Sequence, residues 1–241
     1  HLKMAKHLIS KTSYIKGLQC KKAVYLYKHY PKHKDALSSE RLKRFSAGHE
    51  IGFMARKIFP GGIDISAQIP ATYDEYLKST QEQIKLGKEV IYEATFKYNE
   101  VLVMLDILVK TETGWKAIEV KNSIAISETY KEDASLQYYV ITGSGLPLED
   151  FSLMYLNKLW NEIKKDEEAS SIFITESQNE RCKLDLTKVH SEIEDIRRTL
   201  AGPGIPSIKT GAQCNTPYPC DFIGFCTRQE SEIAEGLFEN L

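Results

Sequence analysis

The amino-acid sequence predicts an α/β domain with a mixed central β-sheet flanked by helices. Apolar residues recur at helical spacing in the first part of the chain, and three consecutive segments rich in Val, Ile, Phe and Tyr follow. A further helical segment and further strand-like segments come next. A chain of 241 residues with 42% hydrophobic residues can bury one sizeable core. We therefore expect one domain over residues 1–241, with N-terminal helices at 8–60, a core at 88–175 and a C-terminal segment at 201–241.

Capping residues and glycines mark the ends of the expected helices. Ser10 is a typical N-cap residue, and Ser38 or Ser39 with Glu40 begins a second helix that Gly61 and Gly62 end. The expected helices run from Ser10 through Val24, from Ser38 or Ser39 through Ile58, and over about Asp74–Leu86, Tyr130–Thr142 and Leu184–Leu200.

The strand-like segments are separated by short polar turns. Asn99-Glu100 joins the first two segments, and Thr111–Gly114 joins the second to the third, which predicts an antiparallel meander. The expected strands are Val90–Tyr98, Val101–Lys110, Trp115–Lys121, Phe151–Leu159 and Ser171–Thr175.

The apolar runs are too short for a membrane protein. A membrane-spanning helix needs roughly 20 apolar residues, whereas the longest runs here have the length of a strand. The run Met4–Ile9 is short and contains Lys6 and His7, so it does not resemble a signal peptide. We expect a cytoplasmic protein that does not associate with membranes.

Charge is distributed unevenly along the chain. Residues 1–60 hold 14 Lys and Arg against 3 Asp and Glu, whereas the remainder holds 18 against 30. Basic residues interleaved with tyrosines can neutralise phosphates and stack on bases. A solvated helix face would have the same composition, so the pattern alone does not decide between a nucleic-acid surface and an ordinary one.

Two carboxylates and a lysine are the main candidates for chemistry. Asp106 lies in the apolar segment Leu102–Val109, where burying an unpaired carboxylate would cost on the order of several kcal/mol. Across the expected hairpin, Glu119 and Lys121 lie on one face of a strand. Paired carboxylates bind Mg²⁺ or Mn²⁺, and with a nearby ammonium they suit phosphodiester hydrolysis. An ordinary salt bridge on a sheet is the alternative.

Further residues extend this pattern to a known superfamily. His49 lies in a helical segment before the strands, and Asp133 and Gln137 lie four residues apart on the helix after them. Over most of its length the sequence resembles the PD-(D/E)xK nuclease superfamily, in particular its RecB-like branch. Asp133 and Gln137 depart from the residue types usual at this place in the branch.

The resemblance implies a restriction-endonuclease-like core and a metal-dependent nuclease. It implies that Mg²⁺ or Mn²⁺ is bound by His49, Asp106, Glu119 and the backbone carbonyl of Val120, while Asp106, Glu119, Lys121 and Gln137 act in catalysis. Glu93, on the neighbouring strand, is a candidate outer carboxylate, and an exposed surface position is the alternative for it.

The cysteines form a second candidate site. Cys214, Cys220 and Cys226 are each separated by five residues in a turn-rich segment, and Cys20 is the natural fourth member. Cys182 has no cysteine near it in sequence and lies in a context that resembles a surface turn. A chain without a secretory signal favours metal binding over disulfides. Four thiolates suit either Zn²⁺ or an iron–sulfur cluster.

The layout of these cysteines is similar to that of AddB-type helicase–nucleases and CRISPR-associated RecB-like exonucleases. Those proteins hold a 4Fe-4S cluster with one cysteine before the nuclease core and three after it, although with different spacing. The chain also resembles the N-terminal nuclease region of an uncharacterised bacterial family. Longer members of that family continue into an RNase H-like domain, so the resemblance implies a short member or part of a longer protein.

Taken together, these patterns predict a Mg²⁺- or Mn²⁺-dependent deoxyribonuclease. The resemblance favours an exonuclease that acts on single-stranded DNA. Two other functions stay open: a catalytically silent nucleic-acid-binding module with a structural iron–sulfur or zinc site, and a zinc-stabilised interaction domain in which the carboxylates only form surface pairs.

Overall fold

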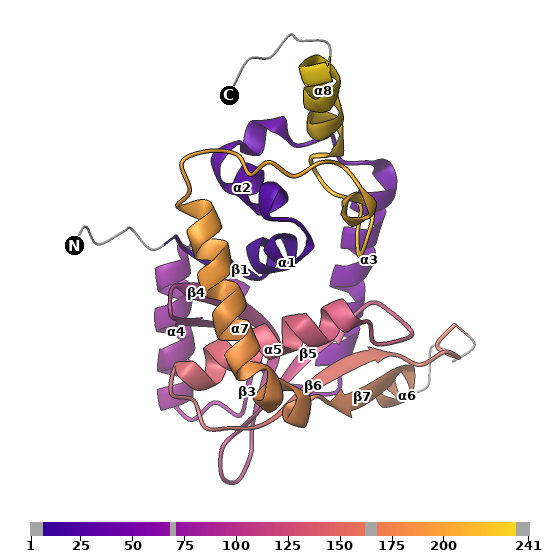
Figure 1. Cartoon of the computed structure of the whole chain (residues 1–241). Coiled ribbons are helices and arrows are strands. Elements are labelled where there is room, and N and C mark those ends of the chain that lie inside the picture. The colour runs from indigo at the N-terminus through magenta and orange to yellow at the C-terminus, as the bar shows by residue number, and fades with distance from the viewer. Residues whose placement is uncertain (1–6, 68–70, 162–167, 235–241) are drawn as a thin grey trace, which may run out of the picture. The chain divides into compact units, whose positions relative to one another are not determined.

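The structure is a computed structural model that describes residues 7–67, 71–161 and 168–234 (Figure 1). The segment Met4–Ile9, from which we expect no signal peptide, includes residues that lie outside the described ranges. The chain divides into two compact units, residues 39–186 and residues 1–38 with 187–241. No helix in the described ranges has both the length and the apolar character needed to cross a membrane.

The unit formed by residues 39–186 is built on a mixed β-sheet, which confirms the predicted α/β class. Its strands lie in the order β2-β3-β4-β5-β6-β7. The pairs β3/β4, β4/β5 and β6/β7 are antiparallel, whereas β2/β3 and β5/β6 are parallel. The strands are β2 (Ile63–Asp64), β3 (Val90–Tyr98), β4 (Val101–Lys110), β5 (Trp115–Lys121), β6 (Leu148–Leu156) and β7 (Phe173–Ser177).

The central meander has the residue bounds that the sequence predicts. Strands β3, β4 and β5 begin and end at the expected residues, and Asn99 and Glu100 both have positive φ in the turn between β3 and β4. Strand β6 begins and ends three residues earlier than expected, and β7 lies two residues later. The meander is better predicted because its turn residues are distinctive.

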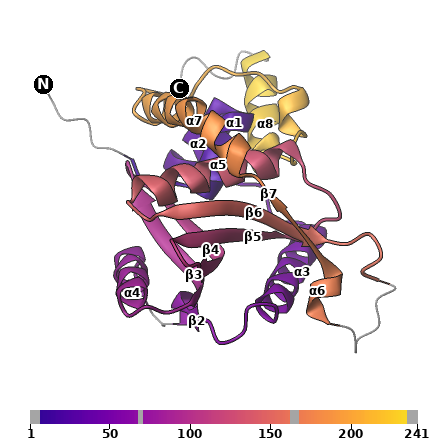
Figure 2. The ribbon, with the colours of Figure 1, turned by 90° about the horizontal axis from the view of Figure 1, so that it is seen from below.

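Helices cover both faces of this sheet (Figure 2). Helix α5 lies on one face, whereas α3 and α4 lie on the other. Thr72 and Glu75 form a capping box at the start of α4, and Ser127 caps α5 by accepting a hydrogen bond from the Tyr130 N–H. The helices and short 3₁₀ turn of this unit are α3 (Ser39–Arg56), η2 (Ile65–Ala67), α4 (Tyr73–Lys85), α5 (Glu128–Gly143) and α6 (Ala169–Ile172).

A hydrophobic core between α3 and the sheet fixes which way each strand residue points. Ile51 and Ala55 of α3 pack in one cluster with Ile107 of β4 and Ile118 of β5. Side chains alternate between the faces of a strand. The residues beside the two isoleucines in sequence, Asp106 and Glu119, therefore point to the face that α5 covers.

The other unit joins N-terminal helices to the C-terminal segment. Its elements are β1 (Ile9–Ser10), α1 (Lys11–Gln19), α2 (Lys21–His29), η1 (Pro31–His33), η3 (Ala212–Cys214) and α8 (Ile223–Ala234), and it shares α7 (Asn179–Leu200) with the first unit. Ser10 caps α1 as expected. The single helix expected through Val24 is interrupted, because Cys20 has an extended backbone, with φ −161° and ψ 122°.

Side chains of α1 and α2 hold the C-terminal loop in place. The Gln19 side-chain amide donates to the backbone carbonyls of Gln213 and Tyr218, at 2.7 Å each. Lys16 forms an ion pair with Asp221. Leu26, Phe222 and Cys226 pack as a small buried cluster. Residues some 200 positions apart in sequence thus form one local structure.

Gly114 lies where the β4–β5 turn passes close to the chain before β6. A β-carbon added at Gly114 would lie 2.4 Å from the backbone carbonyl oxygen of Pro147. We expect Gly114→Ala to destabilise the protein by about 1–3 kcal/mol, because backbone atoms have to move apart. Gly52→Ala is the control, since a β-carbon there meets nothing within 4 Å and alanine favours a helix by about 1 kcal/mol. Urea denaturation followed by circular dichroism should give opposite signs for the two variants.

Candidate active site and cysteine pocket

Strands β4 and β5 bring Asp106, Glu119 and Lys121 together on the face covered by α5. The pairing of Ile107 with Ile118 places Asp106 across from Glu119. The backbone N–H of Val120 donates to Asp106 Oδ2 at 2.7 Å. Lys121 Nζ lies 2.9 Å from Glu119 Oε1. The structure therefore gathers the three residues that the sequence singles out.

Helix α5 adds a third carboxylate to this group. Asp133 Oδ2 accepts a hydrogen bond from Lys121 Nζ at 2.5 Å, and Asp133 Oδ1 accepts one from Gln137 Nε2 at 3.3 Å. Asp133 and Gln137 are one helical turn apart, so both reach the same spot. The role of Asp133 is open from the sequence alone. In the structure, Asp133 contacts Lys121 directly.

This carboxylate cluster, formed by Asp106, Glu119, Lys121 and Asp133, is largely buried. Glu119 is 3% exposed and Asp133 is 6% exposed. Burial would lower the pKa of Lys121, but the charges of Asp133, Glu119 and Asp106 raise it well above its ordinary value. Lys121 is thus an ammonium ion at neutral pH. Lys121 contacts two of the three carboxylates directly, Glu119 and Asp133.

Gln137 lies at the base of this cluster and is completely buried. Its Nε2 donates to Asp133, whereas its Oε1 has no hydrogen-bond partner among the described residues. A buried amide oxygen without a partner costs about 1–3 kcal/mol. The cost indicates that Gln137 is placed here to orient Asp133.

Glu93 on β3 is half-buried and belongs to a second charged group. It accepts a hydrogen bond from Arg56 of α3 at 2.7 Å, and Arg56 also binds Asp64 at 2.6 Å. Burial raises the pKa of Glu93 despite Arg56, and the Glu119 and Asp64 carboxylates raise it further. Glu93 also has a positive φ of 54° in the middle of a strand. An exposed surface position, the alternative that the sequence left open, does not describe it.

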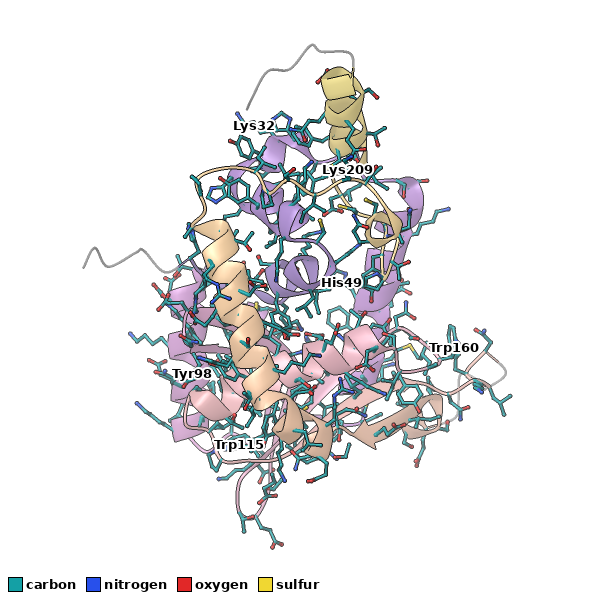
Figure 3. The ribbon with its side chains drawn as sticks, viewed as in Figure 1. Lys32, His49, Tyr98, Trp115, Trp160 and Lys209 are labelled. Carbon is teal, nitrogen blue, oxygen red and sulfur yellow. The ribbon has the colours of Figure 1, made fainter. Side chains whose placement is uncertain are left out.

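His49 lies on α3 and is exposed (Figure 3). The residues with described positions contain no group of three His, Cys, Asp or Glu side chains arranged to hold a metal ion. The predicted metal site formed by His49, Asp106, Glu119 and the Val120 carbonyl stays a prediction.

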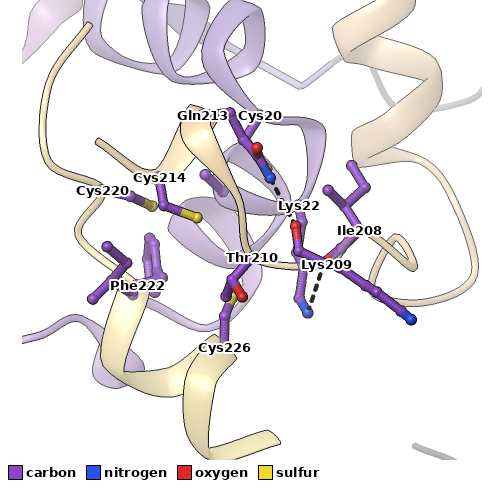
Figure 4. A pocket seen from close by; sticks show the side chains of 12 residues that line it. Cys20, Lys22, Ile208, Lys209, Thr210, Gln213, Cys214, Cys220, Phe222 and Cys226 are labelled. Carbon is purple, nitrogen blue, oxygen red and sulfur yellow. Dashed lines mark hydrogen bonds between the residues drawn. The ribbon is translucent and has the colours of Figure 1, made fainter. Parts of the chain in front are cut away.

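Four cysteines line one pocket in the unit formed by residues 1–38 and 187–241. Cys20 comes from the break between α1 and α2, and Cys214, Cys220 and Cys226 come from the C-terminal segment (Figure 4). The backbone N–H of Cys220 donates to the Cys214 carbonyl at 2.8 Å. Burial raises the pKa of the Cys220 thiol, and Cys20 and Cys214 raise it further. The set of four cysteines predicted from sequence is thus brought to one place as free thiols.

Several basic side chains in the first quarter of the chain form ion pairs within their own unit or are buried. Lys16 pairs with Asp221, Lys21 with Asp195, and Arg56 with Asp64 and Glu93. Lys22 is 6% exposed. These residues are not available as a phosphate-binding surface, so a count of charges overstates that surface.

Comparisons with known proteins do not identify a family for this chain. No protein-family profile matches the sequence, and no curated protein matches it either. Among solved structures, the crystal structure of SSO0001 is similar to this chain with a TM-score of 0.44 and 13% sequence identity. The similarity covers 92% of this chain and 90% of that one. A likeness of this degree carries no argument about function.

The expectation that Cys182 lies in a surface turn is wrong. Cys182 lies on α7, which begins at Asn179 rather than near Leu184, and it is 0% exposed. Its sulfur lies 3.9 Å from the Ser135 hydroxyl of α5. The first residues of α7 are mostly polar, so the spacing of apolar residues does not predict that the helix begins there. Cys182 is a core residue, which leaves the other four cysteines as the pocket set.

Burial raises the pKa of Cys182 to about 12. At pH 8 only about one Cys182 side chain in ten thousand is then the reactive thiolate, against about a quarter for a free thiol. We expect iodoacetamide at pH 8 to leave Cys182 unmodified in the native protein and to modify it in urea. Peptide mass spectrometry measures this, and equal labelling in both conditions would contradict the buried position.

Proposed function

We propose that the chain is a metal-dependent deoxyribonuclease of the PD-(D/E)xK type, with a restriction-endonuclease-like core. The observation that carries the proposal is the convergence of Asp106, Glu119 and Lys121 on one sheet face, with Asp133 binding the lysine. By the resemblance given above, the substrate is single-stranded DNA and the mode of action is that of an exonuclease.

The donor chemistry of the carboxylate cluster fits Mg²⁺ or Mn²⁺. Asp106 and Glu119 offer oxygen ligands, which these hard cations prefer. His49 and the Val120 carbonyl would complete the ligand set. When bound, the ion polarises the phosphate and acidifies a water molecule.

Lys121 has a definite role in this scheme. Burial would lower the pKa of Lys121, but the carboxylates around it raise that pKa well above the ordinary value when no metal ion is present. Its ammonium group stabilises the negative charge that develops on the phosphate in the transition state. Asp133 and Gln137 position it, because Asp133 contacts Lys121 and Gln137 contacts Asp133.

Glu93 takes an outer place in the same scheme. Arg56 already occupies one of its oxygens, so Glu93 does not need a metal ion to compensate its charge. From β3, which β4 separates from β5, it interacts electrostatically with Glu119. We therefore rank Glu93 below Asp106 and Glu119 as a metal ligand.

The decisive test is cleavage of end-labelled DNA. We expect Mg²⁺ or Mn²⁺ to support cutting of single-stranded DNA and EDTA to abolish it. Glu119→Gln keeps the shape of the side chain but removes its charge, so its rate should fall by at least about a hundredfold.

Glu176→Gln is the matched control, since Glu176 is an exposed glutamate on β7 whose side chain binds Tyr155 and no other described residue. The control should cut at the parent rate. Equal rates for the parent and Glu119→Gln would remove Glu119 from the active site.

The four cysteines are proposed to hold a 4Fe-4S cluster, with Zn²⁺ as the alternative. Four thiol donors line one pocket, and thiolates are the ligands that both centres use. In the described residues the four thiols are not arranged as a metal-holding group, so a bound centre would have to draw them together. The ligands come from both ends of the chain, so a bound centre would fasten the C-terminal segment to the start of α2. The expected consequence is structural, because binding energy at such a site is also folding energy.

Replacing one ligand tests the cysteine site. We expect Cys220→Ser, purified anaerobically, to lose most of its iron and its brown colour and to melt at a lower temperature than the parent. Cys182→Ala is the control, because Cys182 lies outside the pocket and should keep the cluster. Iron, zinc and sulfide analysis would identify a zinc centre, and a parent with neither metal would contradict the site.

A second candidate function is a catalytically silent nucleic-acid-binding module. The observation in its favour is that Lys121 already pairs with Glu119 and Asp133, so the cluster is partly compensated without a metal ion. Cluster-loaded protein that binds DNA but does not cut it with either metal ion would favour this candidate over the nuclease.

A further inference from the structure

Lys22 is a buried lysine in the cysteine pocket that the proposed chemistry does not use. It is 6% exposed and lies in the first turn of α2. Its Nζ donates to Gln229 Oε1 at 2.8 Å. It also donates to the Ile208 carbonyl at 3.4 Å (Figure 4). Both acceptors are neutral, so they satisfy hydrogen bonds without balancing the charge.

Other lysines of the same unit are balanced by carboxylates. Lys16 pairs with Asp221, and Lys21, next to Lys22 in sequence, pairs with Asp195 at 2.8 Å. Thr210 binds both oxygens of the Glu230 carboxylate and lowers its pKa, and Lys22 lowers that pKa further. Within the part of the chain that the structure describes, Lys22 is therefore the buried lysine of this comparison that lacks a carboxylate bonded to it.

The position of Lys22 is costly in two ways. Burying an ammonium group away from a counter-charge costs on the order of several kcal/mol. A positive side chain in the first turn also opposes the helix dipole, whose positive end lies there. Such a placement calls for a negative group nearby, and the same pocket is lined by four thiols.

Lys22 lines the same pocket as the four cysteines. Thiolates that ligate a metal centre carry a net negative charge whether the centre is zinc or an iron–sulfur cluster. Lys22 thus lies where it would offset the charge of a bound centre.

We propose that Lys22 is the charge-compensating residue of the cysteine site and that it raises the reduction potential of the bound iron–sulfur cluster. This inference rests on the cluster assigned under the proposed function. Reduction adds one electron and hence one negative charge to the cluster. A fixed positive charge beside the cysteines stabilises the reduced form more than the oxidised form.

Redox titration of the purified, cluster-loaded protein tests the proposal. We expect Lys22→Met to favour the oxidised cluster by about tenfold, which is about 59 mV for a one-electron couple. Lys21→Met removes the adjacent lysine, whose charge Asp195 balances, and should shift the potential much less. Electron paramagnetic resonance of the reduced cluster at each applied potential gives the midpoint.

Two further variants separate charge from packing. Lys22→Gln should show the same shift as Lys22→Met, whereas Lys22→Arg should keep the parent potential. If Lys22→Met does not fold, the comparison of Lys22→Gln with Lys22→Arg decides. A midpoint that is unchanged in Lys22→Gln, or that shifts equally in Lys21→Met, would overturn the proposal.

The failure of this inference is distinguishable from failure of the site itself. A parent protein without iron would refute the assigned cluster and the redox role together. If the parent holds a full cluster and the Lys22 variants have the same midpoint potential as the parent, only the role of Lys22 is refuted. Nuclease activity enters neither comparison.

Discussion

The arrangement around β4 and β5 depends on one buried ammonium group. Lys121 lies between Glu119 and Asp133 and forms an ion pair with each of them inside the protein. Removing one partner from a buried pair costs about 3–5 kcal/mol. The strand register, the start of α5 and the rotation of that helix must therefore all place their side chains at Lys121. This requirement links the sheet to the helix more specifically than apolar packing does.

The backbone of β5 also positions Asp106, the carboxylate that β4 contributes to the cluster. The N–H of Val120 donates to Asp106 and turns that carboxylate toward Glu119. A shift of β5 by one residue would send Glu119 and Lys121 to the face packed by α3. The isoleucines of the core, Ile107 and Ile118, oppose such a shift because they would leave their cluster. Apolar packing on one face therefore fixes the charged geometry on the other.

The sequence predicts the regular parts of this molecule well and its irregular parts poorly. Strands β3 to β5 follow from alternation and turn residues, and Asp106, Glu119 and Lys121 follow from polar groups in apolar strands. The break at Cys20, the positive φ of Glu93 and the burial of Cys182 depend on contacts with distant segments. The local propensity of a segment does not depend on residues far away in sequence, so it cannot predict such contacts. The same holds for the role of Asp133, which only the packing of α5 reveals.

Asp133 changes the charge balance of the candidate site. A neutral amide at this position would leave Lys121 to neutralise Glu119 alone, and the site would have less need of a cation. With a carboxylate there, the charge of Lys121 is shared between Glu119 and Asp133, and Asp106 adds a further negative charge that raises the pKa of the lysine. Asp133 therefore adds a second carboxylate to the direct surroundings of the lysine. In the scheme proposed above, a divalent cation is the partner that suits these carboxylate oxygens.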